Sequence, residues 1–326
     1  MFGRIFGKVD AYNTMDKNPF SIYDFMGYLF PGIIALFFIQ LMWDGNEDSI
    51  YNILNIGNFE GITKEINESI NIETSIVCIV LSYVIGHIIA YISSVTIEYF
   101  ANKTFGYPSE YLMSNKEQDW FDLLSRYFLD MKKEDVLVNG IMKSLKSKLL
   151  SGRFWWRLII STILSPLSFM TFTFSHLSGI NNFIIRPLDD YLKNSIQEKS
   201  FKMANRLGIN YPSNGIDCDY HRVIMHYVYY NLPVCQNKTD NYISLYGFLR
   251  SICFILNGMF LFITIKIIPT LDFNASFDEK KVWTWSILFV LSYISFLAFV
   301  KFYRRFTLEN YMIMLTERKV EVEVDN

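Results

Sequence analysis

The sequence has few of the features that mark secreted or nucleic-acid-binding proteins. Its only cysteines are Cys78, Cys218, Cys235 and Cys253, and two of them lie inside apolar stretches. This is no disulfide framework of a secreted domain, and it favours a reducing, cytosolic face. The formal net charge is −2, so an anionic partner would need a local basic patch. Residues 1–24 lack the apolar stretch of a signal peptide, and we expect the first apolar helix to stay in the mature protein.

Catalytic and metal-binding motifs are also scarce. The sequence has no nucleophile elbow, phosphate-binding glycine loop, HExxH helix or paired-carboxylate motif, and only His87 and Glu98 could form an acid–base pair. His221 and His226 lie among acidic and cysteine residues, but a spacing of five residues suits no single helix face and no standard zinc site. We therefore predict no enzyme, no metal and no cofactor, and interpret residues 219–230 as a surface helix with incidental histidines.

Hydrophobic residues, in contrast, are abundant: they make up 51% of the 326 residues, with 29 Phe and 21 Tyr. About 20 apolar residues in a helix cross about 30 Å of hydrocarbon. Four uncharged stretches approach this length, at residues 25–43, 74–97, 251–265 and 282–300, and the third is extended past Lys266 to Pro269. The sequence thus predicts an all-α integral membrane protein with four transmembrane helices in two hairpins. A helix interruption is expected at Pro31–Gly32 because proline removes a backbone donor.

The distribution of Lys and Arg predicts the topology. The N-terminal arm and the region after the fourth stretch are basic, whereas the loop after the first stretch is acidic. Both termini should therefore lie in the cytoplasm of a bacterial cell, with the protein in the inner membrane. The predicted segments are a cytosolic arm (1–24), a first hairpin (25–98), a mainly helical cytosolic insert (99–249), a second hairpin (250–305) and a cytosolic tail (306–326).

One ambiguous apolar segment lies within the insert, at residues 158–177. It is long enough to span, but Ser, Thr, Pro166 and His176 dilute it, and both of its flanks are basic. Crossing would place one basic flank outside, so we expect that it does not cross. It is then either an interfacial or re-entrant membrane segment or a core helix broken near Pro166.

The second apolar stretch carries two patterns. Ser82, Gly86, Ala90 and Ser94 recur at four-residue spacing and predict a close helix–helix contact. On an adjoining face, polar residues lie within about 40° of His87 at about 100° per residue; they are Tyr83, Tyr91, Ser94 and Glu98. This stripe is either interhelical hydrogen bonding within one subunit or the lining of a conduit. Asn257 and Thr264, with Arg250 and Cys253, form a weaker stripe in the third stretch.

A basic cluster precedes the ambiguous segment. Lys143, Lys146, Lys148, Arg153 and Arg157 occur without an acidic residue between them and are interleaved with Phe154, Trp155 and Trp156. The cluster could bind anionic headgroups with its tryptophans at the membrane interface. It could also bind a nucleotide or short oligonucleotide by charge and stacking, or be a solvated helix face.

Four motifs bear a resemblance to a known group of proteins. They are YDFMGYLFPG, SYVIGHIIAYISSVTIE, YGFLRSICFILNG and KFYRRFTLENYMIML, at the four stretches and their flanks. They resemble bacterial membrane proteins of anti-phage defence islands, among them the membrane effector paired with a nucleotidyltransferase in Hailong-type systems. The resemblance implies a homo-oligomeric, channel-like effector that a nucleotide signal controls and that depolarises the inner membrane in abortive infection.

Three classes of function are compatible with these patterns. The first is a gated pore controlled by a ligand or partner at the insert, because polar stripes, an interrupted span and a large insert occur together. The second is a non-conducting membrane scaffold or receptor that recruits a soluble partner, in which the stripes only hold helices together. The third is a membrane enzyme, which the lack of a catalytic motif disfavours.

Overall fold

A computed structural model describes residues 24–43, 72–114, 120–129, 151–174, 179, 184–209, 218–232, 235–267 and 279–317. Within these ranges, the secondary-structure elements are α-helices and π-helical turns (η), so the predicted all-α class is confirmed for them. The elements are η2 (Phe25–Leu29), α2 (Phe30–Trp43), α5 (Ile72–Ser93), η3 (Ser94–Glu98), α6 (Tyr99–Phe105), α7 (Pro108–Met113), α8 (Trp120–Leu124), η4 (Ser125–Leu129), α11 (Gly152–Ile163), α12 (Ser165–Phe169), η5 (Met170–Phe174), α15 (Asp190–Arg206), α16 (Cys218–Asn231), α17 (Gln236–Ile267) and α18 (Glu279–Thr316).

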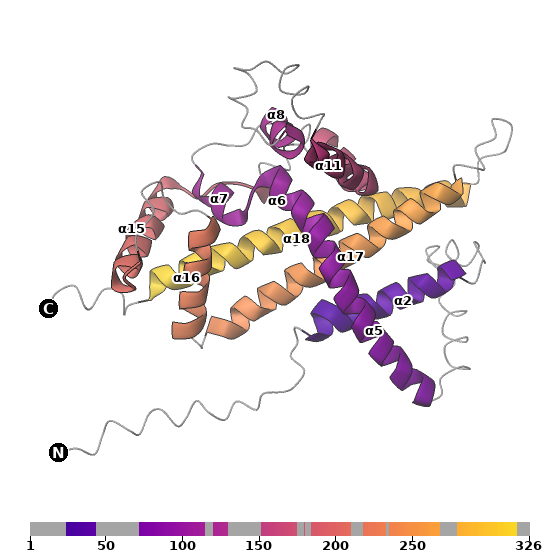
Figure 1. The fold of residues 1–326 in the computed structure, drawn as a ribbon, viewed down its shortest axis with the longest axis horizontal. Helices are drawn as coiled ribbons and strands as arrows, with labels where there is room; N and C mark the ends of the chain where they lie inside the picture. Colours follow the sequence, from indigo (N-terminus) through magenta and orange to yellow (C-terminus); the bar gives the residue numbers. More distant parts are fainter. Residues whose placement is uncertain are drawn as a thin grey trace.

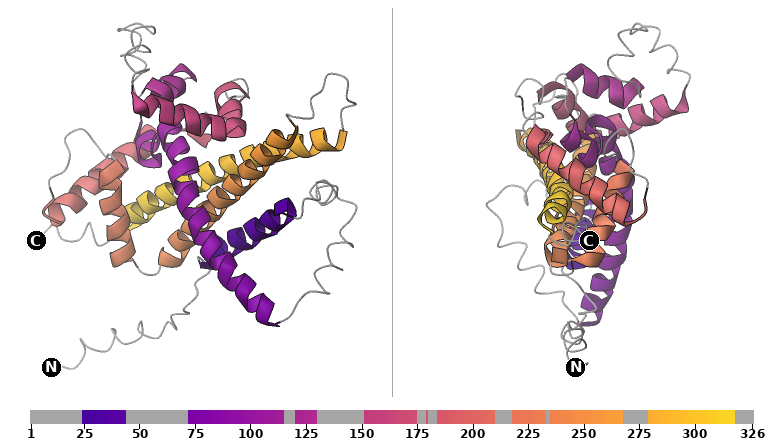
Figure 2. Two further views of the ribbon diagram at one scale, coloured as in Figure 1. Left: turned by 45° about the vertical axis from the view of Figure 1, so that its right-hand side comes forward. Right: turned by 90° about the vertical axis from the view of Figure 1, so that its left-hand side faces the viewer.

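The two longest helices, α17 and α18, lie side by side in opposite directions (Figures 1 and 2). Their pairing is marked by Trp285, whose Nε1 donates to the Thr264 hydroxyl at 2.9 Å, and by Cys253, whose thiol lies 3.5 Å from the Ser292 carbonyl. α18 has 38 residues. At 1.5 Å per residue, α18 is about 57 Å long, whereas the hydrocarbon core of a bilayer is about 30 Å thick. A crossing perpendicular to a bilayer would therefore leave part of α18 outside the hydrocarbon.

Helix length and composition identify the membrane-spanning candidates. Ser75–Met113, Gln236–Ile267 and Lys281–Thr316 are long and apolar enough to cross, whereas Phe25–Gln40 is apolar but shorter. The bent pair Gly152–Ile163 and Ser165–Phe174 becomes a fourth candidate if it is counted as one span. Exposed apolar side chains on α5 and α18 would face lipid. The chain is therefore a membrane protein, while the number of crossings and the two-hairpin topology stay predictions.

The first helices make a close backbone contact with α5. A Cβ atom added to Gly86 would lie 1.9 Å from the Tyr28 carbonyl oxygen, and one added to Gly32 would lie 1.7 Å from the Ser82 carbonyl oxygen. Both glycines are therefore required for this approach. The expected interruption does not fall at Pro31–Gly32 itself, where α2 continues. Instead, the π-helical turn η2 ends just before it, and the Phe30 N–H bonds to the Phe25 carbonyl five residues back.

The insert and the long helices share one hydrophobic core. Phe100 of α6 contacts Phe296 of α18 at 5.6 Å between ring centroids and Tyr127 of η4 at 5.1 Å. All three side chains are fully buried. α5 crosses the α17–α18 pair instead of running beside it (Figures 1 and 2), so that its continuation, η3 and α6, reaches this core.

Polar contacts fix the end of α18 to the insert. The Lys199 ammonium of α15 is buried and donates to the Leu315 carbonyl at 2.8 Å and to the Glu317 carbonyl at 2.5 Å. Carbonyls at a helix C-terminus lack intrahelical partners and attract cations, so Lys199 caps α18. α15 and α16 belong to the insert that the sequence predicts to be mainly helical, whereas residues 130–150 of that insert lie outside the described residues.

The glycine contact yields the first prediction. Gly86→Ala and Gly32→Ala should each destabilise the protein, because overpacking costs about 1–3 kcal/mol and the neighbouring atoms here are backbone atoms. Gly258→Ala is the matched control: Gly258 also lies inside a long apolar helix, but an added Cβ meets no atom within 4 Å. Thermal unfolding in detergent measures the three variants. Equal melting temperatures for Gly86→Ala and Gly258→Ala would contradict the close approach.

Candidate functional site

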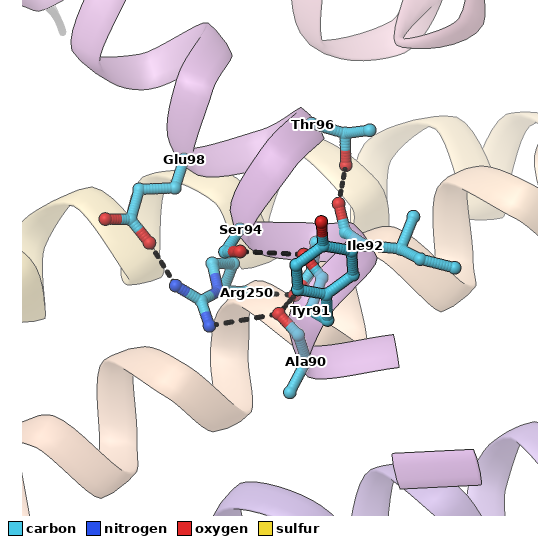
Figure 3. Close-up of polar contacts among 8 residues, drawn as sticks. Ala90, Tyr91, Ile92, Ser94, Thr96, Glu98 and Arg250 are labelled. Carbon is cyan, nitrogen blue, oxygen red and sulfur yellow. Dashed lines mark hydrogen bonds and ion pairs between the residues drawn. The ribbon is translucent and has the colours of Figure 1, made fainter. Parts of the chain in front are cut away.

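A polar cluster joins α5 to α17 at the end of the uncharged part of α17. The Arg250 guanidinium forms an ion pair with Glu98 and donates from Nη2 to the Ala90 carbonyl at 3.2 Å (Figure 3). Its Nε also donates to the Ser93 hydroxyl at 3.2 Å. The Arg250 and Glu98 side chains are 14% and 25% exposed. The guanidinium thus reaches three acceptors of the crossing helix, one for each of its nitrogens.

The π-helical turn η3 explains why Glu98 can reach Arg250. The Tyr99 N–H bonds to the Ser94 carbonyl, five residues back. An extra residue in one turn rotates the subsequent residues by about 100° relative to a regular α-helix. Glu98 therefore leaves the face of His87 and turns toward the side of Ser93, which is fully buried. The regular spacing of an α-helix did not identify Ser93 as a partner of Arg250. The signal that could have found it is Arg250 itself, because an arginine at the end of an uncharged stretch requires a nearby acceptor.

His87, at the other end of the predicted stripe, belongs to a separate aromatic group. Its ring stacks on Tyr28 with centroids 3.8 Å apart and lies edge-on to Tyr83 at 4.4 Å. Its Nδ1 lies 2.9 Å from the Tyr83 carbonyl. This group bridges α5 and η2 beside the Gly86 contact. The stripe is therefore divided between two helix partners within one chain, and His87 and Glu98 form no acid–base pair.

Between these groups, Ser94 of the stripe and the nearby Thr96 bond to their own helix. The Ser94 hydroxyl donates to the Tyr91 carbonyl at 2.7 Å, and the Thr96 hydroxyl donates to the Ile92 carbonyl at 2.8 Å (Figure 3). The Tyr91 side chain is 71% exposed. Tyr91 thus projects from the chain.

Asn257 and Thr264 of α17 both lie in interhelical contacts. The Asn257 amide donates to the Ile163 carbonyl of α11 at 2.8 Å, and the Thr264 hydroxyl accepts from Trp285 of α18 at 2.9 Å. Asn257 is 1% exposed. Neither residue shares a cluster with His87 or Arg250.

The basic cluster is only partly described. Lys143, Lys146 and Lys148 lie outside the described residues. Arg153 is exposed at the start of α11, whereas Arg157 is buried and donates from Nη1 to the Tyr127 carbonyl at 2.9 Å and from Nε to the Tyr99 hydroxyl at 3.3 Å. The structure therefore separates Arg153, which faces outward, from Arg157, which is part of the core. Binding of an anionic ligand or headgroup by the cluster stays a prediction.

The two histidines of α16 have different surroundings. His226 is exposed, but His221 is buried and packs edge-on against Tyr311 at 5.2 Å between centroids, so α16 is not simply a surface helix. Burial lowers the pKa of His221 to about 4, against a smaller opposite effect of the Thr307 backbone. No group of three or more potential metal ligands occurs among the described residues.

Comparison of the chain with protein-family models, curated proteins and solved structures finds no match. The chemistry of the site therefore rests on its own geometry. The Arg250 cluster holds an ion pair inside an otherwise apolar helix crossing, and the His87 group holds the neighbouring helix. Such contacts can fix helices together, and they can also separate as a unit when a second arrangement becomes more favourable.

The ion pair yields the second prediction. Arg250→Gln and Glu98→Gln should each lower thermal stability, since removing one partner leaves the other charge uncompensated. Full burial makes such a loss about 3–5 kcal/mol, and the partial exposure of this pair should reduce it. The double variant Glu98→Gln/Arg250→Gln should be more stable than the sum of the single effects implies. Strict additivity in this double-mutant cycle would show that the two side chains do not interact.

The third prediction concerns His221 and pH. The pKa of His221 in the folded protein lies below its value of about 6.5 in the unfolded chain. Between these two pH values, the unfolded chain therefore binds a proton on His221 more readily than the folded protein does. Stability should be full above pH 6.5 and fall as the pH decreases toward 4, by about 1.4 kcal/mol per pKa unit. His221→Phe should remove this part of the pH dependence of the melting temperature, and His226→Asn should retain it. Identical pH profiles of wild type and His221→Phe would refute the assignment.

Proposed function

We propose that this chain is a gated membrane effector that forms an oligomeric pore, and that the Arg250–Glu98 contact holds its closed arrangement. The observation that carries the proposal is this ion pair at the crossing of α5 and α17, two candidate membrane-spanning helices. An ion pair between apolar helices is favourable only while both partners meet. Separation of α5 from α17 leaves the Arg250 and Glu98 charges needing water.

This requirement connects the ion pair to conduction. Groups that need water at a helix crossing favour a hydrated space once the helices part. The crossing also contains Ser93, whose hydroxyl accepts from Arg250. In the closed arrangement these groups satisfy one another, which keeps the crossing dry. The conduit is therefore proposed for the separated state or for the boundary between copies, where the exposed Tyr91 projects.

The cellular setting belongs to the same proposal and is supported by the motif resemblance. We place the chain in the bacterial inner membrane with both termini in the cytoplasm, acting by depolarisation in anti-phage defence. A nucleotide or short oligonucleotide made by a partner nucleotidyltransferase would bind the insert. The basic cluster, of which Arg153 is exposed, supports an anionic ligand of this kind.

A scaffold is the second candidate, and a specific observation favours it. His87, Glu98, Asn257 and Thr264 all have partners within the single chain. If these contacts never separate, the stripe serves only to hold helices together, and the insert would recruit a soluble protein to the membrane. The two candidates differ in whether the protein conducts.

The fourth prediction distinguishes them by recordings from protein in planar bilayers. Arg250→Gln should raise the open probability several-fold, because the closed arrangement loses its ion pair. Arg250→Lys should have a weaker effect, since it retains the charge but loses the planar fork that reaches three acceptors. Gly258→Ala serves as the control. Size-exclusion chromatography verifies that all variants keep the wild-type assembly. If neither wild type nor Arg250→Gln conducts, the scaffold is the better account.

A further inference from the structure

The bent pair formed by α11 and the α12–η5 segment has a sharply turned backbone. The two limbs meet at an angle of 98°. Leu164, between them, departs from helical geometry with φ −93° and ψ 39°, and Pro166 is near the start of α12. Proline lacks the N–H that would continue the helix, so the break is built into the sequence. A break of this kind belongs either to an interrupted span or to a segment that enters a membrane and returns.

Contacts of the two limbs decide between these arrangements. Arg157 of the first limb donates to the Tyr127 carbonyl at 2.9 Å, and the Tyr127 hydroxyl donates to the Arg157 carbonyl at 3.0 Å. Phe172 of the second limb packs on the same Tyr127 at 5.8 Å between centroids. Both limbs therefore return to one residue of the insert core. In an interrupted span, the limbs would contact opposite ends of the neighbouring helices.

The bend itself lies away from that core, at the middle of the apolar part of the long helices. Ile163 accepts from Asn257, which lies nearly midway between Arg250 and Lys266, the charges that bound the uncharged stretch of α17. Phe169, just after the bend, contacts Phe289 of α18 at 6.0 Å between centroids. If α17 crosses the bilayer, as its length and composition allow, the bend lies near the bilayer midplane.

The outer face of the pair is apolar and uncovered. Trp155, Trp156, Ile159 and Phe169 are 53%, 51%, 47% and 59% exposed. On the opposite side, Ile160 and Leu164 are buried against the protein. A helix with this division would leave a large apolar patch in water, which soluble surfaces avoid. At the depth of Asn257 in a bilayer, lipid acyl chains would cover this apolar face.

We infer that residues 152–174 form a re-entrant helical hairpin, inserted from the side of the insert and covered outside by acyl chains of one leaflet. Its dimensions agree with one leaflet: the rise from Arg153 to Ile163 is about 15 Å, half of the about 30 Å of hydrocarbon. The exposed Arg153, with Trp155 and Trp156, then lies at headgroup depth. This inference does not depend on conduction and holds for a pore and for a scaffold alike.

Asn257 gives the hairpin its attachment inside the membrane. The last carbonyls of a helix lack an intrahelical donor, and hydrocarbon offers no water to satisfy them. The Asn257 amide supplies the missing donor to Ile163, while the Ser168 hydroxyl donates to the Ser161 carbonyl at 3.0 Å. The break is therefore capped from α17 and from the second limb. Asn257 is a positioning residue for this hairpin.

Site-directed spin labelling in liposomes tests the inference. Single cysteines at Arg153, Trp156, Ile159 and Phe169, all exposed positions, would be labelled in a background that lacks Cys78, Cys218 and Cys235 and keeps the buried Cys253. Power saturation with oxygen and with a water-soluble nickel chelate gives the depth of each label. The oxygen-to-nickel accessibility ratio should rise from 153 through 156 to 159, toward the bend, and should not rise further at 169, which lies on the returning limb. A label at the exposed Asn205 of α15 is the aqueous control.

Labelling with a membrane-impermeant maleimide completes the test. Cysteines replacing Arg153 and Arg186, which flank the pair, should react from the same side of sealed vesicles. Reaction from opposite sides would identify an interrupted span and overturn the inference. A depth profile at 156, 159 and 169 equal to that of Asn205 would instead identify a core element in water, and would overturn it equally. Asn257→Leu should make the label at 169 more accessible to the nickel chelate, whereas Gly258→Ala should not.

Discussion

The guanidinium of Arg250 needs an anion where α17 passes into its uncharged stretch, and this need constrains how the first helices of the chain lie on α17. Glu98, the Ser93 hydroxyl and the Ala90 carbonyl meet the requirement together, which sets where α5 crosses α17. α2 is then placed on α5 through the contact of Gly32 and Gly86. The continuation of α5 brings Phe100 into the core that the insert shares with α18. One ion pair therefore positions the first helices and the beginning of the insert.

The remaining contacts satisfy backbone groups away from water. Lys199 caps the end of α18, and Asn257 caps the broken end of α11. Both are polar side chains that are almost fully buried, and both act on carbonyls that a helix end leaves without partners. The protein thus uses few polar groups inside apolar surroundings, and each is bonded across elements distant in sequence. The contacts that stabilise the fold are therefore the same contacts that a conformational change would have to break.

The sequence predicted the helices well and their mutual contacts poorly. Long uncharged stretches identify α5, α17 and α18, because only helices satisfy the backbone in hydrocarbon. The four-residue spacing of Ser82 and Gly86 pointed to a close approach, but its partner Gly32 was interpreted as part of a kink. A helical wheel of a regular α-helix placed Glu98 on the same face as His87, whereas the π-helical turn η3 moves Glu98 to another face. The contact of Arg157 with Tyr127 joins residues thirty positions apart, and no local pattern encodes it.

The Arg250 ion pair should determine how α5 lies on α17. Double electron–electron resonance measures this directly in lipid nanodiscs, with spin labels at the exposed positions Ile88 of α5 and Asn241 of α17. Wild type should give one narrow distance distribution. Arg250→Gln should broaden it or shift it to longer distances, while Gly258→Ala leaves it unchanged. A distribution in Arg250→Gln that is as narrow as in wild type, at the same distance, would contradict the account.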